Sequence, residues 1–163
     1  MLTALQEQLG EAHGLAIAAA VTVDRVEERL LDHRLRRYLD TMRLDGNELR
    51  PRCLEVERWF GEETATEILA HANTISEKGA DLAGAWFKAG TSPLAAWTFL
   101  AMGEAAEVAA WAALDSYAAR AGPEPVAELA GWALSVQRRH LQLALDGAVL
   151  LADGADPAAP RWG

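Results

Sequence analysis

Apolar side chains recur at steps of three and four residues along the first part of the chain. Between residues 2 and 19 these positions are Leu2, Leu5, Leu9, Ala12, Leu15, Ala16 and Ala19. Further on they are Val26, Leu30, Leu35, Leu39 and Met42. This period is typical of helices that bury one side. Residues 2–44 are therefore predicted to be helical, either as one bent helix or as two. We favour two, with a turn near Thr22–Asp24.

Turn-forming residues divide the middle of the chain. Asp24-x-x-Glu27 has the spacing of a capping box, which predicts a helix start. Asp45-Gly46-Asn47 is a local breaker, so the second helix is predicted to be interrupted there before it ends near Gly61. Residues 62–91 are predicted to form a helical crossover, with short helices at 62–73 and 76–89.

Two long helices follow the crossover. Pro93 comes directly after the capping residue Ser92, and Gly122-Pro123 separates residues 93–121 from residues 124–152. Two helices of equal length joined by a tight turn form an antiparallel hairpin, which is the unit of a helical bundle. We therefore predict a single helical domain over residues 1–152, followed by a loose tail over residues 153–163 that is rich in proline and alanine.

Composition restricts the class of function. The 163 residues are enough for one domain with a hydrophobic core. The net charge of −9 argues against nucleic acid as a partner, because such binding relies on neutralising phosphates. The apolar stretches are too short to cross a membrane and the first residues do not resemble a signal peptide, so we predict a cytoplasmic protein. Cys53 is the only cysteine and is predicted to be a core residue.

Candidate chemistry is concentrated in the last two helices. Glu104 and Glu107 stand one turn apart among apolar neighbours, so at least one of these carboxyl groups is predicted to lie near the core. A buried carboxylate needs a proton, a partner or a metal. His140, one turn after Gln137 on the facing helix, is the candidate partner. The alternative is that Glu104 faces solvent while Glu107 pairs with Arg138 or Arg139.

Glu104-x-x-Glu107-x-x-x-Trp111, followed by Gln137-x-x-His140, resembles the second hairpin of ferritin-like proteins. It is similar in particular to small bacterial stress-associated bundles. The resemblance implies an all-α, ferritin-like four-helix bundle with a helical crossover between helices two and three. It also implies metal-ligand roles for Glu107 and His140, with Gln137 in the place of a bridging Glu. Glu11 would be the carboxylate of the first helix.

The first half of the chain departs from that pattern. No Glu-x-x-His is present near residues 45–50, and Arg50 stands where the His is expected. A cation at that position repels a metal ion. We therefore predict a ferritin-like bundle without a working di-iron centre and with no cofactor. It is predicted to act as an interaction or stress-related protein. Its expected partners are a second copy of the chain, in a homodimer, and another protein that the sequence does not identify.

Two alternatives remain open. The first is an iron- or manganese-binding protein that uses Glu11, Glu104, Glu107 and His140, for which the resemblance implies iron oxidation or peroxide disposal. The second is a binder of apolar small molecules, with a cavity lined by Trp97, Trp111 and Trp132. The other histidines, His13, His33 and His71, lack the spacing of a zinc site and are predicted to be surface or capping residues.

Overall fold

The computed structural model describes residues 1–159, and these residues form five α-helices with no strand. The helices are α1 (Ala4–Glu27), α2 (His33–Arg58), α3 (Glu62–Trp86), α4 (Pro93–Ala121) and α5 (Glu124–Asp153). The chain is therefore all-α, as predicted. Residues 154–159 after α5 are exposed, and the remainder of the predicted tail, residues 160–163, lies outside the described residues.

The turn between the first two helices lies later than predicted. α1 continues through Thr22–Asp24 to Glu27, and α2 begins after Asp32, whose carboxylate accepts a hydrogen bond from the backbone N–H of Arg34. Asp24 and Glu27 do not start a helix. Both instead accept hydrogen bonds from Arg43, at 2.9 and 2.6 Å, and so tie α1 to α2.

α2 is continuous across Asp45-Gly46-Asn47 and Pro51, so the predicted interruption is wrong. The buried residues of this helix explain why, because they form one apolar stripe, with Leu35, Leu39 and Met42 before the predicted break and Leu49 and Cys53 after it. The free energy gained by burying that stripe outweighs the weak helix propensity of Asp45, Gly46 and Asn47. It also outweighs the loss of the single backbone hydrogen bond that Pro51 removes. α3 is likewise one helix where two short ones were predicted, whereas α4 has the predicted bounds and α5 ends one residue later than predicted.

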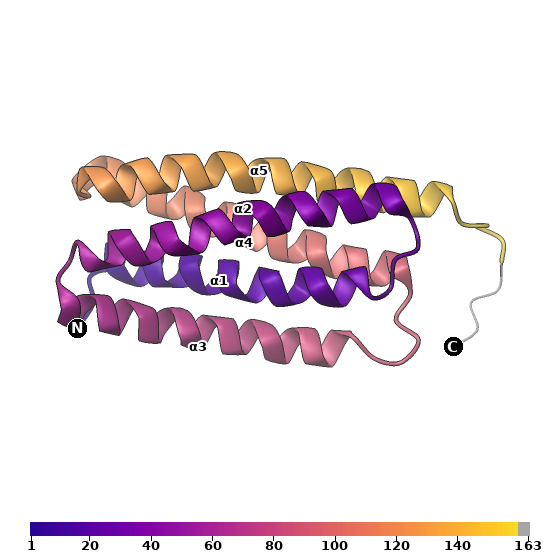
Figure 1. Cartoon of the computed structure of the whole chain (residues 1–163), viewed down its shortest axis with the longest axis horizontal. Coiled ribbons are helices and arrows are strands. Elements are labelled where there is room, and N and C mark those ends of the chain that lie inside the picture. Colours follow the sequence, from indigo (N-terminus) through magenta and orange to yellow (C-terminus); the bar gives the residue numbers. More distant parts are fainter. Residues whose placement is uncertain (160–163) are drawn as a thin grey trace.

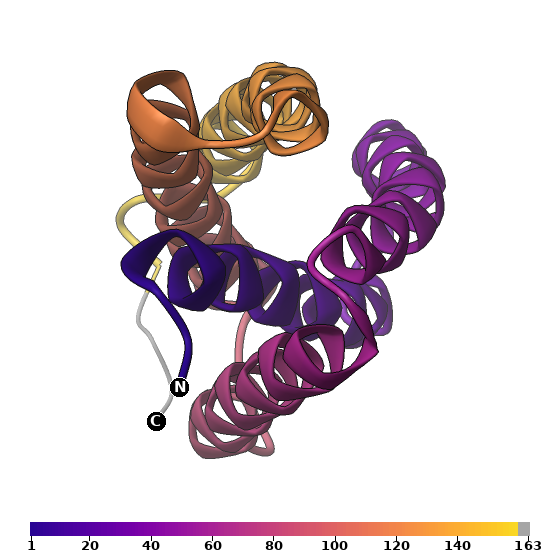
Figure 2. The ribbon, with the colours of Figure 1, turned by 90° about the vertical axis from the view of Figure 1, so that its left-hand side faces the viewer.

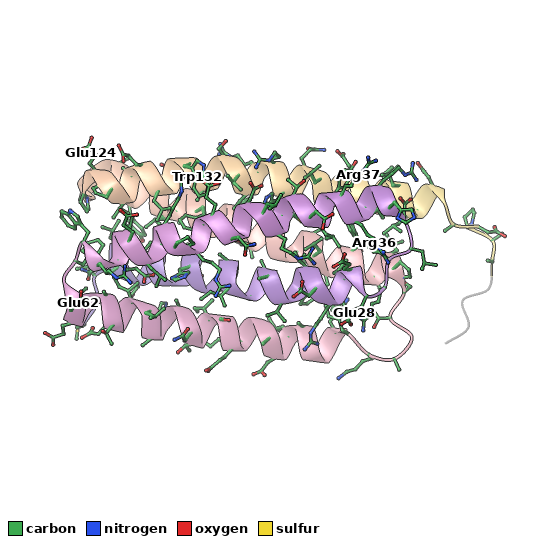
Figure 3. All side chains as sticks on the ribbon, in the orientation of Figure 1. Glu28, Arg36, Arg37, Glu62, Glu124 and Trp132 are labelled. Carbon is green, nitrogen blue, oxygen red and sulfur yellow. The ribbon has the colours of Figure 1, made fainter. Side chains whose placement is uncertain are left out.

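The helices run along a common long axis (Figure 1). Glu62 and Glu124, the first residues of α3 and α5, lie at the same end of the molecule, and Arg36 near the start of α2 lies towards the other end (Figure 3). α2 and α4 therefore run parallel, and α3 carries the chain back between them. Viewed end-on, α1 is central (Figure 2). It packs against α2, α3 and α4, while α5 packs against α4 and α2.

Glycines allow α1 and α3 to approach closely. A Cβ at Gly10 would lie 2.9 Å from the carbonyl oxygen of Ile68, and one at Gly14 would overlap the carbonyl oxygen of Ala72. On the other helix, a Cβ at Gly79 would lie 2.6 Å from that of Ala18. α3 is thus held against the outer side of α1, which leaves the inner side of α1 free to face α2 and α4.

The core forms two clusters of buried side chains along the axis, one containing Trp111 and the other containing Trp97. Both tryptophans are fully buried and pack among aliphatic residues. Trp132 lies on α5 (Figure 3). Its side chain is half-buried, with the guanidinium of Arg52 stacked 4.1 Å from its ring centre. Among residues 1–159, none of the helices combines the length and the apolarity needed to cross a bilayer.

A buried carboxylate and imidazole cluster as the candidate functional site

The candidate residues of α4 and α5 lie between the two core clusters. Glu104 and Glu107 are each 2 % exposed, and Gln137 and His140 are each 3 % exposed. Burial of both carboxyl groups follows from their apolar surroundings on α4. Nδ1 of His140 lies 3.5 Å from Oε2 of Glu104. The alternative in which Glu104 faces solvent is therefore wrong.

His140 also contacts a residue that sequence reasoning missed. Its Nε2 lies 2.8 Å from Oδ2 of Asp45 on α2. Arg139 donates a hydrogen bond to the same oxygen at 2.6 Å, so this arginine pairs with Asp45 and not with Glu107. Asp45 stands three residues after Met42 and four before Leu49, in a gap of the apolar stripe. That gap is the signal that could have placed its carboxylate at the inner side of α2.

The imidazole and the two carboxylates form a linked group of charges. Burial alone would lower the pKa of His140, but the contacts and negative charges of Glu104 and Asp45 outweigh burial and raise that pKa. Burial alone would raise the pKa of Asp45, but His140 and Arg139 outweigh it and lower that pKa. The surroundings therefore favour the protonated form of His140 between two acidic side chains, and in that form the cluster balances much of its own charge.

Glu107 lies one turn of α4 after Glu104. Burial, and then the charge of Glu104, raise the pKa of Glu107 well above its ordinary value. Three buried oxygens at this level have no hydrogen-bond donor, namely Oε2 of Glu104, Oε2 of Glu107 and Oε1 of Gln137. Unpaired buried acceptors are costly, so these atoms mark a place where a proton, a water molecule, a cation or a ligand would be stabilised.

A cavity of about 40 Å³ lies beside these oxygens, enough for one or two water molecules. α4 and α5 contribute Glu104, Glu107, Gln137 and His140 to its wall. The opposite wall comes from α1 and α2 and includes Ala16, Ala19, Ala20, Asn47 and Arg50. The acidic and imidazole groups of the wall therefore come only from α4 and α5.

Glu11 does not join this group. It is exposed on α1 and does not line the cavity, where α1 contributes alanines and Val23. Within residues 1–159 no three His, Cys, Asp or Glu side chains converge closely enough to hold a metal ion. Of the four residues predicted as metal ligands, the structure thus gathers Glu104, Glu107 and His140 around one cavity, with only Glu104 in contact with the imidazole.

A second buried polar pair lies between α1 and α2. Nδ1 of His13 is 2.6 Å from Oε1 of Glu57, and both side chains are 2 % exposed. The prediction of His13 as a surface or capping residue is therefore wrong, although its position beside Leu9, Ala12 and Ala16 on the apolar stripe was a signal of burial. His33 is exposed and His71 is half-buried.

Cys53 is buried, as predicted for a core residue. Burial, and then the charges of Glu57 and Glu107, raise the pKa of its thiol far above the ordinary value. A thiol in these surroundings stays protonated and is a poor nucleophile.

Comparison with protein-family models finds no matching family, and comparison with the curated proteins and with the solved structures finds no matching protein.

Replacing Glu107 by glutamine is expected to stabilise the fold increasingly as pH rises. The folded-state pKa of Glu107 is raised, so its favourable contribution is fully present below the unfolded value near 4.5 and is lost as pH rises towards the folded value. Glutamine stays neutral and its amide can donate to an unpaired oxygen. The gain over the native chain should reach about 1–3 kcal/mol at pH 8 and be smaller at pH 5.

Urea unfolding of both chains at the two pH values measures this difference. The control is Glu77→Gln at an exposed position of α3, where the difference from the native chain should not depend on pH. A stability gain of Glu107→Gln that is equal at pH 5 and pH 8 would contradict the raised pKa.

Proposed function

We propose that this chain is a ferritin-like helical bundle without a working two-metal centre, which acts as a homodimeric interaction protein. The proposal of a four-helix bundle is supported by the arrangement of α1, α2, α4 and α5 around one central cavity. α3 occupies the place of the crossover, since it connects the parallel helices α2 and α4.

The donor set argues against two metal ions. A di-metal site of this kind draws carboxylates from all four helices and a Glu-x-x-His from two of them. Here α1 lines the cavity with alanines, and α2 contributes Asn47 and Arg50. The one imidazole is already hydrogen-bonded to Asp45, which in turn pairs with Arg139. The remaining anionic groups are too few to offset two divalent ions.

The observation that carries the interaction function is the uncharged exposed side of α4. Between Pro93 and Leu114 the only charged residues are Glu104 and Glu107, and both are buried. Thr98, Ala105 and Ala109 are exposed and lie on one stripe of the helix, which we term the outer stripe of α4. A helix that is apolar on all sides is ordinarily covered on all sides.

A second copy of the chain is the occupant that fits this stripe. Each copy carries a net charge of −9, so an interface between two copies is least unfavourable where it brings no further like charges into contact, as on this stripe. Small side chains on the outer stripe also let two helices approach closely. An interface in which α4 packs against α4 of the other copy would be symmetric, as is usual for homodimers.

Ala105→Arg is expected to convert the dimer into a monomer, because it places a cation at the centre of a stripe that faces its own copy. Light scattering after size exclusion measures the mass, and Ala70→Arg at an exposed position of α3 is the matched control. A native chain that is a monomer at 100 μM, or a dimer that persists in Ala105→Arg, would contradict the proposal.

The unpaired oxygens favour a second candidate function, the binding of a single iron or manganese ion by Glu104, Glu107 and His140. Because these three side chains do not converge closely enough in the described structure, the ion would have to draw them together. Elemental analysis after anaerobic loading with iron(II) separates the two candidates. One ion per chain, lost in Glu107→Ala, would establish the second candidate. Two ions per chain would overturn the proposed absence of a di-metal centre.

A further inference from the structure

A groove lies between α2 and α5 at the end of the molecule where α2 ends and α5 begins, which is the end that faces the viewer in Figure 2. Its volume is about 490 Å³, within the range of about 300–1,000 Å³ that is typical of binding sites. It shares no lining residue with the central cavity. Its walls combine the indole of Trp59 with three charged side chains, those of Arg52, Glu55 and Glu128.

The indole of Trp59 is accessible at this groove. Trp59 is 58 % exposed, whereas tryptophan is highly buried on average. Its ring lies edge to face against that of Phe60, with 5.3 Å between the ring centres, and this contact supports it at the groove wall. Tryptophan is among the residues that most often carry the binding energy of an interface. Trp59 therefore marks the groove as a contact point for a partner.

The charges that line the groove do not balance. Arg52 is already engaged, since it forms an ion pair with Glu48 one turn earlier on α2. Glu55 lies one turn before Trp59, and Glu128 lines the groove from α5. Both carboxylates are exposed, and within residues 1–159 neither of them takes part in an ion pair or a side-chain hydrogen bond. In a chain of net charge −9, two carboxylates without a counter-ion attract a cation and repel an anion.

The structure contains an occupied example of the same arrangement. The guanidinium of Arg52 stacks 4.1 Å from the ring centre of Trp132 and pairs with Glu48. Trp59 and the two free carboxylates of the groove offer the same two kinds of contact with no cation of this chain between them. A guanidinium uses both, because it is planar, stacks on aromatic faces and donates paired hydrogen bonds to a carboxylate. The ammonium group of a lysine brings the charge without the planar shape.

We propose that the groove between α2 and α5 binds an arginine side chain of a partner protein. The guanidinium stacks on Trp59 and pairs with Glu55 and Glu128. At about 490 Å³ the groove holds more than one side chain, so the ligand is a chain segment and not the free amino acid. This site goes beyond the proposed dimer, because it uses α2 and α5 and not the outer stripe of α4.

Calorimetric titration of the full chain with the peptide Gly-Arg-Gly, blocked at both ends, tests the proposal. The control peptide carries citrulline in place of arginine, which keeps the planar shape and removes the charge. We expect saturable binding of the arginine peptide, at least tenfold tighter than that of the citrulline peptide. Equal affinities would show that the carboxylates play no part and would overturn the proposal, as would absence of saturation at 10 mM arginine peptide.

Two substitutions locate the binding. Trp59→Ala and Glu128→Gln should each weaken binding of the arginine peptide at least fivefold, and circular dichroism verifies that both variants are folded. The matched controls are Trp86→Ala and Glu77→Gln, at exposed positions of α3 outside the groove, which should leave the affinity unchanged. Binding that survives Trp59→Ala unchanged would place the peptide elsewhere on the molecule and contradict the proposed site.

The mass of Trp59→Ala distinguishes a partner protein from a second copy of this chain. Light scattering after size exclusion should give the same mass for this variant as for the native chain, because the proposed dimer uses α4. A native dimer that becomes a monomer in Trp59→Ala would show that an arginine of the second copy fills the groove, and would overturn the assignment to another protein. The result with Ala105→Arg has no bearing on this outcome, so the two proposals can fail separately.

Discussion

Trp97→Ala is expected to lower the free energy of unfolding by about 3–5 kcal/mol. The indole is fully buried between α4 and α5, and its Nε1 donates to the carbonyl oxygen of Ala144 at 2.6 Å. The ring occupies the space over Gly147, where a Cβ would overlap it. Alanine would therefore leave a cavity in the contact between α4 and α5, and the loss is a large share of the 5–15 kcal/mol typical of a domain.

Urea unfolding measures the loss at Trp97. Trp59→Ala is the matched control, because this tryptophan is 58 % exposed and its removal should cost under about 1 kcal/mol. Gly147→Ala should also destabilise the chain, by about 1–3 kcal/mol, since the added methyl group pushes against the same ring. A Trp97→Ala variant as stable as Trp59→Ala would mean that the contact between α4 and α5 is not formed as described.

Glu57→Ala is expected to destabilise the chain by a similar amount, about 3–5 kcal/mol. It leaves the buried imidazole of His13 without its acceptor at 2.6 Å, in a place that water does not reach. The stability is lost because the imidazole of His13 stays buried without a partner, and not because its attraction to Glu57 is gone. The double variant His13→Leu/Glu57→Met should therefore recover most of the stability, because both polar groups are then replaced by apolar ones.

Glu55→Ala is the control for this series, since Glu55 is exposed on the same helix two residues away. Glu57→Gln retains an acceptor and should lie between the native chain and Glu57→Ala. All four variants are compared by urea unfolding at pH 7. If the double variant is less stable than Glu57→Ala alone, the pair contributes net stability and the explanation by an unpaired imidazole is wrong.

The second half of the fold was predictable because its local signals agree with its packing. Ser92, Pro93 and the Gly122-Pro123 turn stand at the ends of α4 and α5, and both helices have the predicted extent to within one residue. In the first half local signals and packing disagree. Gly46 and Pro51 weaken the helix locally, but the buried stripe of α2 requires it to continue, and this tertiary requirement decides the outcome.

The part of the candidate site on α4 and α5 was likewise predictable, and the part on α2 was not. The sequence predicted that at least one of Glu104 and Glu107 lies near the core with His140 as its partner, and all three residues are buried. Asp45 was missed because it lies in the turn-forming run that predicted an interruption of the helix. The orientation of an acidic side chain within a helix depends on neighbours that are distant in sequence, in this case Arg139 and His140.

The connections between the helices have a consequence for the order in which the molecule assembles. α1 and α2, like α4 and α5, are joined by short segments, so each hairpin closes at small entropic cost. The bond between Asp45 and His140 joins residues that are 95 positions apart, and it forms only when one hairpin meets the other. We therefore expect the polar cluster to lie on the seam that closes last during folding. The same seam is then the place where a partial opening of the native protein would first admit water.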